Sequence, residues 1–203
     1  DMSALPSISG DGRYVAFVSD STNLTTADLN TSPDIFIHDR QTGETKLASV
    51  SSDGIQGNYS SHSPIISSDG RYVAFYSSAS NLVVQDTNNL EDVFLHDLQT
   101  GYTIRASVNS GLMEGNGDSQ YPTISANGSY ITFHSYATNL ITNDTNNAND
   151  IFVAPVIMPP DQPTGLVATT ASGTQIDLSW TDNATNETAY LVERSLDGNT
   201  WST

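Results

Sequence analysis

The chain has 203 residues, 36% of them hydrophobic and 14% charged, with no cysteine and a formal net charge of −17. This charge would repel the phosphates of nucleic acids and attract divalent cations, so we expect no nucleic-acid partner. The missing cysteines exclude disulfides and thiolate chemistry, and no stretch has the roughly 18–20 apolar residues of a membrane span, so we expect no membrane insertion.

The first predicted element is a β-hairpin near the N-terminus. Ser7–Ser9 reads as a short strand and Arg13–Ser19 as an apolar-rich strand. Asp11-Gly12 between them predicts a tight turn, because glycine tolerates a positive φ and aspartate caps its own turn. The same pattern returns at residues 64–75 and, more loosely, at residues 122–133.

An acidic loop follows each hairpin and leads into another strand. Its pattern is Asp-x-Asn-x-x-x-Asp, then Ile or Val, then Phe, and the interval from the first copy to the second equals that from the second to the third. A pattern that returns at a fixed interval predicts a structural repeat. The polar residues of the three loops are Asp28, Asn30, Asp34, Asp86, Asn88, Asp92, Asp144, Asn146 and Asp150.

Each complete repeat continues with two more strands, which a Gln-Thr-Gly turn connects. Four antiparallel strands joined by tight turns are one blade of a β-propeller. The third strands are predicted at residues 34–39 and 92–97, and the fourth strands at residues 44–50 and 102–108.

The third copy is shorter than the first two. Its third strand begins at Asp150, but Pro155, Pro159 and Pro160 stand where the fourth strand should follow. We therefore predict an all-β fold, in which residues 1–154 form a partial β-propeller of two full four-stranded blades plus an incomplete third.

A proline-rich linker is predicted over residues 155–163. Beyond it, Gln175–Trp180 alternates polar and apolar residues, which is typical of a half-buried strand. Residues 164–203 therefore predict a partial β-sandwich.

Fewer than three complete blades cannot close a ring, which usually needs about four to eight. We infer that the chain is a piece of a longer one or that neighbouring subunits complete the ring. In the second case, strand exchange between subunits would build a filament without bare edge strands.

Two parts of the chain resemble known families. Ile-Ser-x-Asp-Gly-Arg-Tyr-Val-Ala-Phe at residues 8–17 and 66–75, together with the acidic loop, makes residues 5–153 similar to the TolB-like β-propeller repeats of bacterial secreted proteins. The resemblance implies an extracellular bacterial protein, often a modular adhesin, a cell-surface component or the appendage of a hydrolase. Residues 161–203 resemble the first half of a fibronectin type III domain through Pro163, Leu166, Trp180, Tyr190 and the Glu193-Arg194-Ser195 run.

Calcium is the cofactor that the acidic loops predict, because it takes roughly six to eight oxygen ligands. Asp28, Asn30 and Asp34 offer three side-chain oxygens close together in the sequence, and the other two loops offer the same set. The alternative is that these residues only cap turns. The three copies, and the lack of nearby cations to neutralise the acids, favour calcium at all nine residues.

Catalysis is not expected. His38-Asp39 and His96-Asp97 are adjacent strand residues, whose side chains point to opposite faces and cannot form a dyad. We expect structural hydrogen bonds for the histidines, and no Gly-x-Ser-x-Gly nucleophile motif is present. The tyrosines and phenylalanines that recur in the second strands, such as Tyr14 and Phe17, are interpreted as core residues rather than a sugar-binding stripe.

We therefore expect a non-enzymatic extracellular or cell-surface module with a structural or adhesive role. Its expected partners are further copies of itself or other cell-surface proteins and glycans. Two alternatives stay open: the non-catalytic propeller and fibronectin part of a larger secreted hydrolase, and a carbohydrate-binding propeller.

Overall fold

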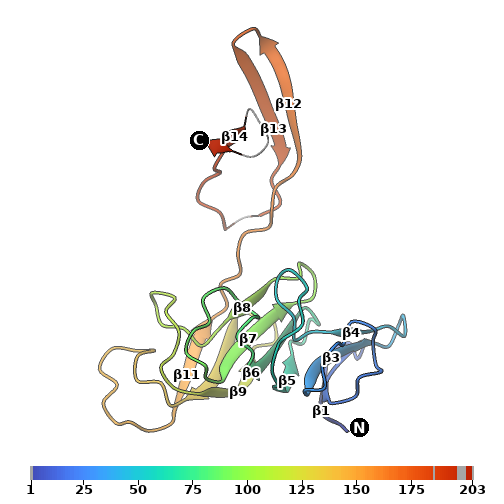
Figure 1. The fold of residues 1–203 in the computed structure, drawn as a ribbon, viewed down its shortest axis with the longest axis vertical. Helices are drawn as coiled ribbons and strands as arrows, with labels where there is room; N and C mark the ends of the chain where they lie inside the picture. Colours follow the sequence, from blue (N-terminus) through green and yellow to red (C-terminus); the bar gives the residue numbers. More distant parts are fainter. Residues whose placement is uncertain (1, 185, 196–199, 203) are drawn as a thin grey trace. The chain divides into compact units, whose positions relative to one another are not determined.

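The computed structural model describes residues 2–184, 186–195 and 200–202, and it divides into two units, Asp1–Ile157 and Met158–Thr203. The division falls inside the predicted linker. Within the described residues the fold is all-β, with antiparallel strand pairing and no helix (Figure 1). Accordingly, these residues offer no helix long and apolar enough to cross a bilayer.

The first unit contains three antiparallel sheets, which we call blades 1, 2 and 3. Each is a meander in which strands that follow one another in sequence pair side by side. Blades 1 and 2 have four strands and blade 3 has three, which confirms the predicted repeat. Blade 1 comprises β1 (Ser3–Ile8), β2 (Tyr14–Ser19), β3 (Asp34–Asp39) and β4 (Thr45–Leu47); blade 2 comprises β5 (Ser61–Ile66), β6 (Tyr72–Ser77), β7 (Asp92–Asp97) and β8 (Thr103–Arg105); blade 3 comprises β9 (Ser119–Ile124), β10 (Tyr130–Ser135) and β11 (Asp150–Pro155).

Side chains set the turn between β1 and β2. The Oγ of Ser9 donates to Oδ1 of Asp11 (2.6 Å), and the same oxygen accepts the Arg13 N–H (2.9 Å). Gly12 has a φ of 72°, which residues other than glycine rarely adopt. The corresponding Ser, Asp or Asn, and Gly make the same turn in blades 2 and 3.

The fourth strands, β4 and β8, are shorter than the sequence predicts, with three residues each. Beyond each of them, a serine hydroxyl accepts a hydrogen bond from a backbone N–H of the third strand. Oγ of Ser49 accepts the Ile35 N–H (3.1 Å), and Oγ of Ser107 accepts the Val93 N–H (3.0 Å). Because a hydroxyl replaces the next backbone carbonyl as acceptor, the regular ladder ends there.

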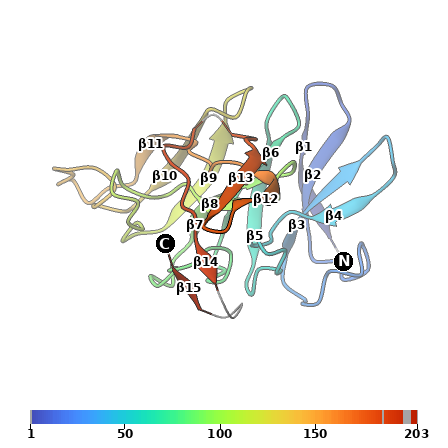
Figure 2. The ribbon, with the colours of Figure 1, turned by 90° about the horizontal axis from the view of Figure 1, so that it is seen from above.

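The three blades lie side by side in chain order (Figure 2). The first strand of blade 2, β5, contacts blade 1, and the first strand of blade 3, β9, contacts blade 2. A stacked phenylalanine pair between the second and third strands recurs in every blade, with ring centroids 5.7, 5.9 and 5.8 Å apart. Four of these six rings, those of Phe36, Phe75, Phe94 and Phe133, are at most 2% exposed. The interpretation as core residues is confirmed for these four phenylalanines, but it is wrong for Tyr130, which is 56% exposed.

The second unit is less regular than the sequence predicts. β12 (Thr164–Ser172) and β13 (Gln175–Thr181) form one hairpin, and β14 (Arg194–Ser195) pairs with β15 (Trp201–Ser202). The apolar pattern of residues 189–194 predicts a further strand, but of these residues only Arg194 lies in one. In the described part of this unit, the two hairpins are separate two-stranded sheets, so residues 189–193 have no neighbouring strand to pair with. A fibronectin-like sandwich is therefore not established.

Candidate metal-binding loops

The nine residues proposed as calcium ligands lie where the second strand of each blade connects to the third. Asp34 and Asp92 open β3 and β7 and are fully buried, and Asp28 is 9% exposed. In blade 3, Asp144 and Asp150 are half-buried and Asn146 is exposed. The repeat therefore brings each trio together, but only blades 1 and 2 enclose it.

A glutamine amide joins the two carboxylates in blade 1. Nε2 of Gln56 donates to Oδ1 of Asp28 (2.8 Å) and to Oδ2 of Asp34 (2.7 Å). The Oγ of Ser49 donates to the other oxygen of Asp34 (2.6 Å). Burial raises the pKa of Asp34, although these hydrogen bonds oppose the shift. Protein donors thus occupy the space between the carboxylates.

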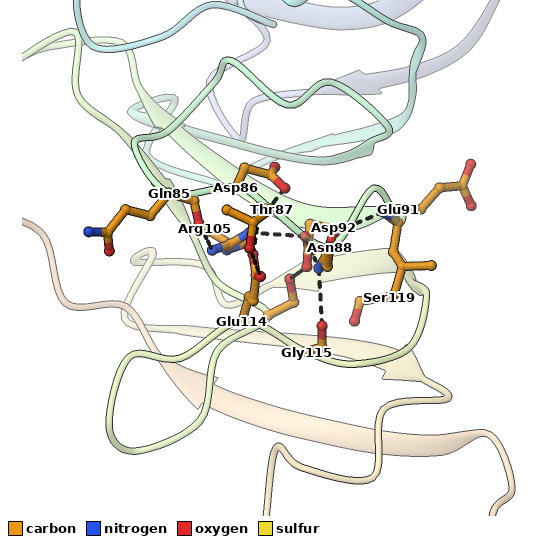
Figure 3. Close-up of polar contacts among 12 residues, drawn as sticks. Gln85, Asp86, Thr87, Asn88, Glu91, Asp92, Arg105, Glu114, Gly115 and Ser119 are labelled. Carbon is orange, nitrogen blue, oxygen red and sulfur yellow. Dashed lines mark hydrogen bonds and ion pairs between the residues drawn. The ribbon is translucent and has the colours of Figure 1, made fainter.

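An arginine takes the same position in blade 2 (Figure 3). Nη1 of Arg105 lies 3.4 Å from Asp86, 3.2 Å from Asp92 and 2.9 Å from Glu114, and the arginine side chain is 8% exposed. The expectation that no cation lies near the acids is therefore wrong in blade 2. Burial raises the pKa of Asp86 to about 6, with a further contribution from Asp92, while Arg105 opposes the shift.

The asparagine side chains turn their amide oxygens toward the loop backbone. Oδ1 of Asn88 accepts the Leu90 N–H (2.8 Å), and its Nδ2 donates to Oδ2 of Asp92 (2.9 Å). Asn146 makes the equivalent bonds to the Ala148 N–H and to Asp150, and Oδ1 of Asn30 accepts the Ser32 N–H. These are Asx turns, the alternative interpretation of the loops. In blades 1 and 2 the donors present do not fit a calcium ion in this arrangement, and calcium binding stays a prediction.

The third loop differs because blade 3 has no fourth strand. Asp144, Asn146 and Asp150 line an open pocket of about 450 Å³, together with Ile151 and Val153 of β11. Within the described part of the chain, neither a glutamine nor an arginine bridges its carboxylates. No group of three or more His, Cys, Asp or Glu side chains in the described residues is arranged as a metal site, so a cation here would depend on Asn146, backbone oxygens and water.

The histidines make the structural hydrogen bonds that the sequence predicts. Nδ1 of His38 lies 2.9 Å from Oγ1 of Thr45 on β4, and Nδ1 of His96 lies 2.8 Å from Oγ1 of Thr103 on β8. Burial lowers the pKa of His96 to about 4.

The aspartates beside these histidines bind arginines instead. Arg13 donates to both oxygens of Asp39 (3.1 and 2.8 Å), and Arg71 does the same to Asp97. The Arg13 guanidinium holds the pKa of Asp39 well below its usual range. Neither His-Asp pair is a dyad.

Sequence reasoning missed the donors that hold the loop carboxylates. Ser49 and Ser107 occupy equivalent positions of the repeat, so an alignment of the repeats would have found them. The donor Gln56 has no such counterpart, because the acceptor Glu114 stands at the equivalent position of blade 2. Arg105 breaks the repeat, because Leu47 stands at the equivalent place in blade 1.

No protein-family model matches the chain, and no curated protein matches its sequence. Among solved structures, TolB from Acinetobacter baumannii is 17% identical, with 90% of this chain and 41% of TolB covered and a TM-score of 0.44. The tricorn protease is 14% identical over 78% of this chain and 14% of that protein, with a TM-score of 0.48. The β-propeller domain of the Trilobed protease from Pyrococcus furiosus is 14% identical over 90% of this chain and 55% of that domain, with a TM-score of 0.41.

The structures that this chain resembles are thus TolB-like and protease β-propellers, and the chain spans less than half of TolB. At such identities the likeness concerns the fold alone, and these TM-scores add no argument about function.

Proposed function

We propose that this chain is a non-enzymatic extracellular or cell-surface module with a structural or adhesive role. The observation that supports the proposal is that the two adjacent histidine–aspartate pairs hold neighbouring strands together. His38 and His96 bond to threonines of the neighbouring strand, and Asp39 and Asp97 bond to arginines. A general acid or base needs access to substrate, and His96 and Asp97, which are 6% and 0% exposed, lack it.

The extracellular location rests on the resemblance of the repeats to those of bacterial secreted proteins. Fractionation of the producing cells, followed by detection with antibodies against the chain, tests it. We expect the protein in the medium or on the cell surface, and recovery from the cytoplasm alone would overturn the proposal.

Calcium is the proposed cofactor, and the third loop is the place where the proposal now applies best. In blade 2 a guanidinium neutralises Asp86 and Asp92, whereas in the described residues Asp144 and Asp150 have no such partner. A cation between them would take the place that Arg105 takes one repeat earlier.

The gene's reading frame and two binding assays separate the alternatives. A catalytic domain in the same reading frame would favour the non-catalytic part of a secreted hydrolase. Retention of defined glycans on an array by the purified chain would favour a carbohydrate-binding propeller. The proposed role predicts no hydrolysis of peptide, ester or glycoside substrates by the purified chain.

A further inference from the structure

Two asparagines in the sequence stand directly before a glycine, at Asn116-Gly117 and Asn127-Gly128. An asparagine in this position readily loses its side-chain amide as ammonia, because glycine has no side chain to keep its backbone nitrogen away from the asparagine Cγ. The reaction requires an asparagine side chain that can turn and a glycine nitrogen that can reach it. The two asparagines differ in how the protein holds them.

The side chain of Asn116 is held through both atoms of its amide. Nδ2 donates to Oγ1 of Thr138 (3.0 Å), and Oδ1 accepts the Thr138 N–H (2.8 Å). A Cβ on Gly117 would lie 2.6–2.7 Å from backbone atoms of residues 136 and 137, so the chain packs tightly against that loop. Asn116 would have to break both hydrogen bonds before its Cγ could turn toward the glycine nitrogen.

The amide of Asn127 is held only through its oxygen. Oδ1 accepts the Ser125 Oγ–H (3.1 Å) and the Ser129 N–H (3.2 Å), whereas Nδ2 has no hydrogen-bond partner among the described residues. The nitrogen that would leave is therefore not tied to the protein. The Gly128 N–H donates to the Ser125 carbonyl (2.9 Å), so the turn has to open locally before the glycine nitrogen can react.

The repeat indicates that this turn is built for a carboxylate. Asp11 and Asp69 stand at the equivalent positions of blades 1 and 2. Their Oδ1 atoms accept the serine hydroxyl at 2.6 and 2.5 Å and the backbone N–H at 2.9 and 3.0 Å, and all four bonds are shorter than those of Asn127. Charged acceptors form shorter and stronger hydrogen bonds than neutral ones. Conversion of Asn127 to aspartate would give blade 3 the turn that the other two blades carry.

The exposure of this turn position is a property of the repeat. Asn127 is exposed, and so are Asp11 and Asp69. Asp69 belongs to blade 2, which has a blade on either side. Water therefore reaches this position in all three blades, whatever lies beyond the first and the last.

We propose that Asn127 is a site of spontaneous deamidation and that the contacts of Asn116 protect it from the same reaction. The Gly128 nitrogen attacks Cγ of Asn127, so that an N–Cγ bond forms and the Cγ–Nδ2 bond breaks. The Gly128 amide proton leaves with Nδ2 as ammonia, and a cyclic imide remains. Water then opens the imide at either carbonyl, which gives aspartate or isoaspartate at position 127. The reaction needs no enzyme, oxidant or cofactor.

The two products affect the turn in opposite ways. Aspartate adds a negative charge and supplies the acceptor that the turn carries in blades 1 and 2. Isoaspartate adds a methylene group to the backbone next to Gly128, whose Cβ position the ring of Tyr72 from blade 2 already fills. This product should therefore loosen the contact between blades 2 and 3. The modification adds to the structural role proposed above but does not depend on it.

Peptide mapping of the full chain by mass spectrometry tests the proposal. The folded chain and a sample unfolded in urea are kept at the same mildly alkaline pH, and the conversion of each asparagine is followed over time. The ratio of a site's rate in urea to its rate in the folded chain measures its protection. We expect the protection of Asn116 to exceed that of Asn127 by at least about tenfold. A smaller difference, or a folded chain in which neither site converts while both convert in urea, would overturn the proposal.

Two variants examine the contacts one at a time. Thr138→Val removes the hydroxyl that accepts the Asn116 amide but keeps the shape of the side chain. Asn116 should then convert faster in the folded chain, while an unchanged rate at Asn127 shows that the fold is intact. An unchanged rate at Asn116 would refute the protective role of this contact. Asn127→Asp reproduces the aspartate product and should melt no lower than the wild-type chain; a lower melting temperature would contradict the preference of the turn for a carboxylate.

Discussion

Removal of the Arg105 side chain should destabilise blade 2 strongly. Arg105→Leu introduces the residue that blade 1 carries at this position, Leu47, so the substitution suits the backbone. It leaves the carboxylates of Asp86 and Asp92, which are 3% and 0% exposed, without their cation. The change therefore tests whether a charge balance inside the protein, rather than a metal, holds this loop.

The structure sets the size of the effect. Breaking a buried ion pair by removing one partner costs about 3–5 kcal/mol, because the remaining charge is buried and uncompensated. For a protein of this length, that corresponds to a fall of about 6–20 °C in melting temperature. The cost should shrink from pH 7.5 to pH 5, because Asp86, whose pKa burial already raises to about 6, can then take up a proton.

A second substitution provides the matched rescue. Glu114→Gln recreates the glutamine of blade 1, where Gln56 bridges the two loop carboxylates through its amide. The double variant Arg105→Leu/Glu114→Gln should recover about 1.5–3 kcal/mol, the range for hydrogen bonds to charged groups. Glu114→Gln alone should cost no more than about 1 kcal/mol, because Glu114 is 23% exposed.

Urea unfolding followed by far-ultraviolet circular dichroism measures these differences in the full chain. A loss of less than about 1 kcal/mol in Arg105→Leu, or no recovery in the double variant, would refute the reasoning.

Two further predictions follow from the blades. His96 has a pKa of about 4 in the folded chain and near 6.5 in the unfolded chain, so between these pH values only the unfolded chain protonates it. The free energy of unfolding should therefore fall from pH 6.5 to pH 4. His96→Gln should flatten that part of its pH profile. A steeper profile in the variant would contradict this. Gly70→Ala should cost about 1–3 kcal/mol more in thermal unfolding than Gly43→Ala, because both have φ near 75° but only the former brings a Cβ within 2.9 Å of Tyr14. Equal costs would show that the tyrosine moves freely.

The blades were predictable from sequence because the repeat is local and periodic. Asp11-Gly12 and its copies mark the hairpin turns, and alternation of apolar residues marks the strands that follow. The histidine hydrogen bonds were predictable for the same reason, since the facing strand in each repeat lies a fixed distance along the chain.

The loop contacts were harder to predict because their donors come from elsewhere in the chain. Gln56 lies beyond both of the strands that follow Asp28, and Arg105 ends the second strand after Asp86. With only six basic residues in the chain, the sequence predicted no cation near the loops. Folding, however, brings β8 beside the blade 2 loop and buries Arg105 there. Likewise, the apolar pattern of residues 189–194 could not show whether a neighbouring strand exists to pair with them.

A thermal melt with calcium and then with excess chelator tests the proposed calcium-braced module most directly. At a calcium concentration about a hundredfold above Kd, binding to the folded state alone adds about 2.7 kcal/mol, or about 5–10 °C. The account predicts that this shift disappears in Asp144→Asn/Asp150→Asn and persists in Asp28→Asn, whose loop Gln56 already bridges. No shift in the wild-type chain would contradict the account and leave the aspartates as turn caps. A shift that survives the third-loop substitutions would contradict it by placing the calcium outside the third loop.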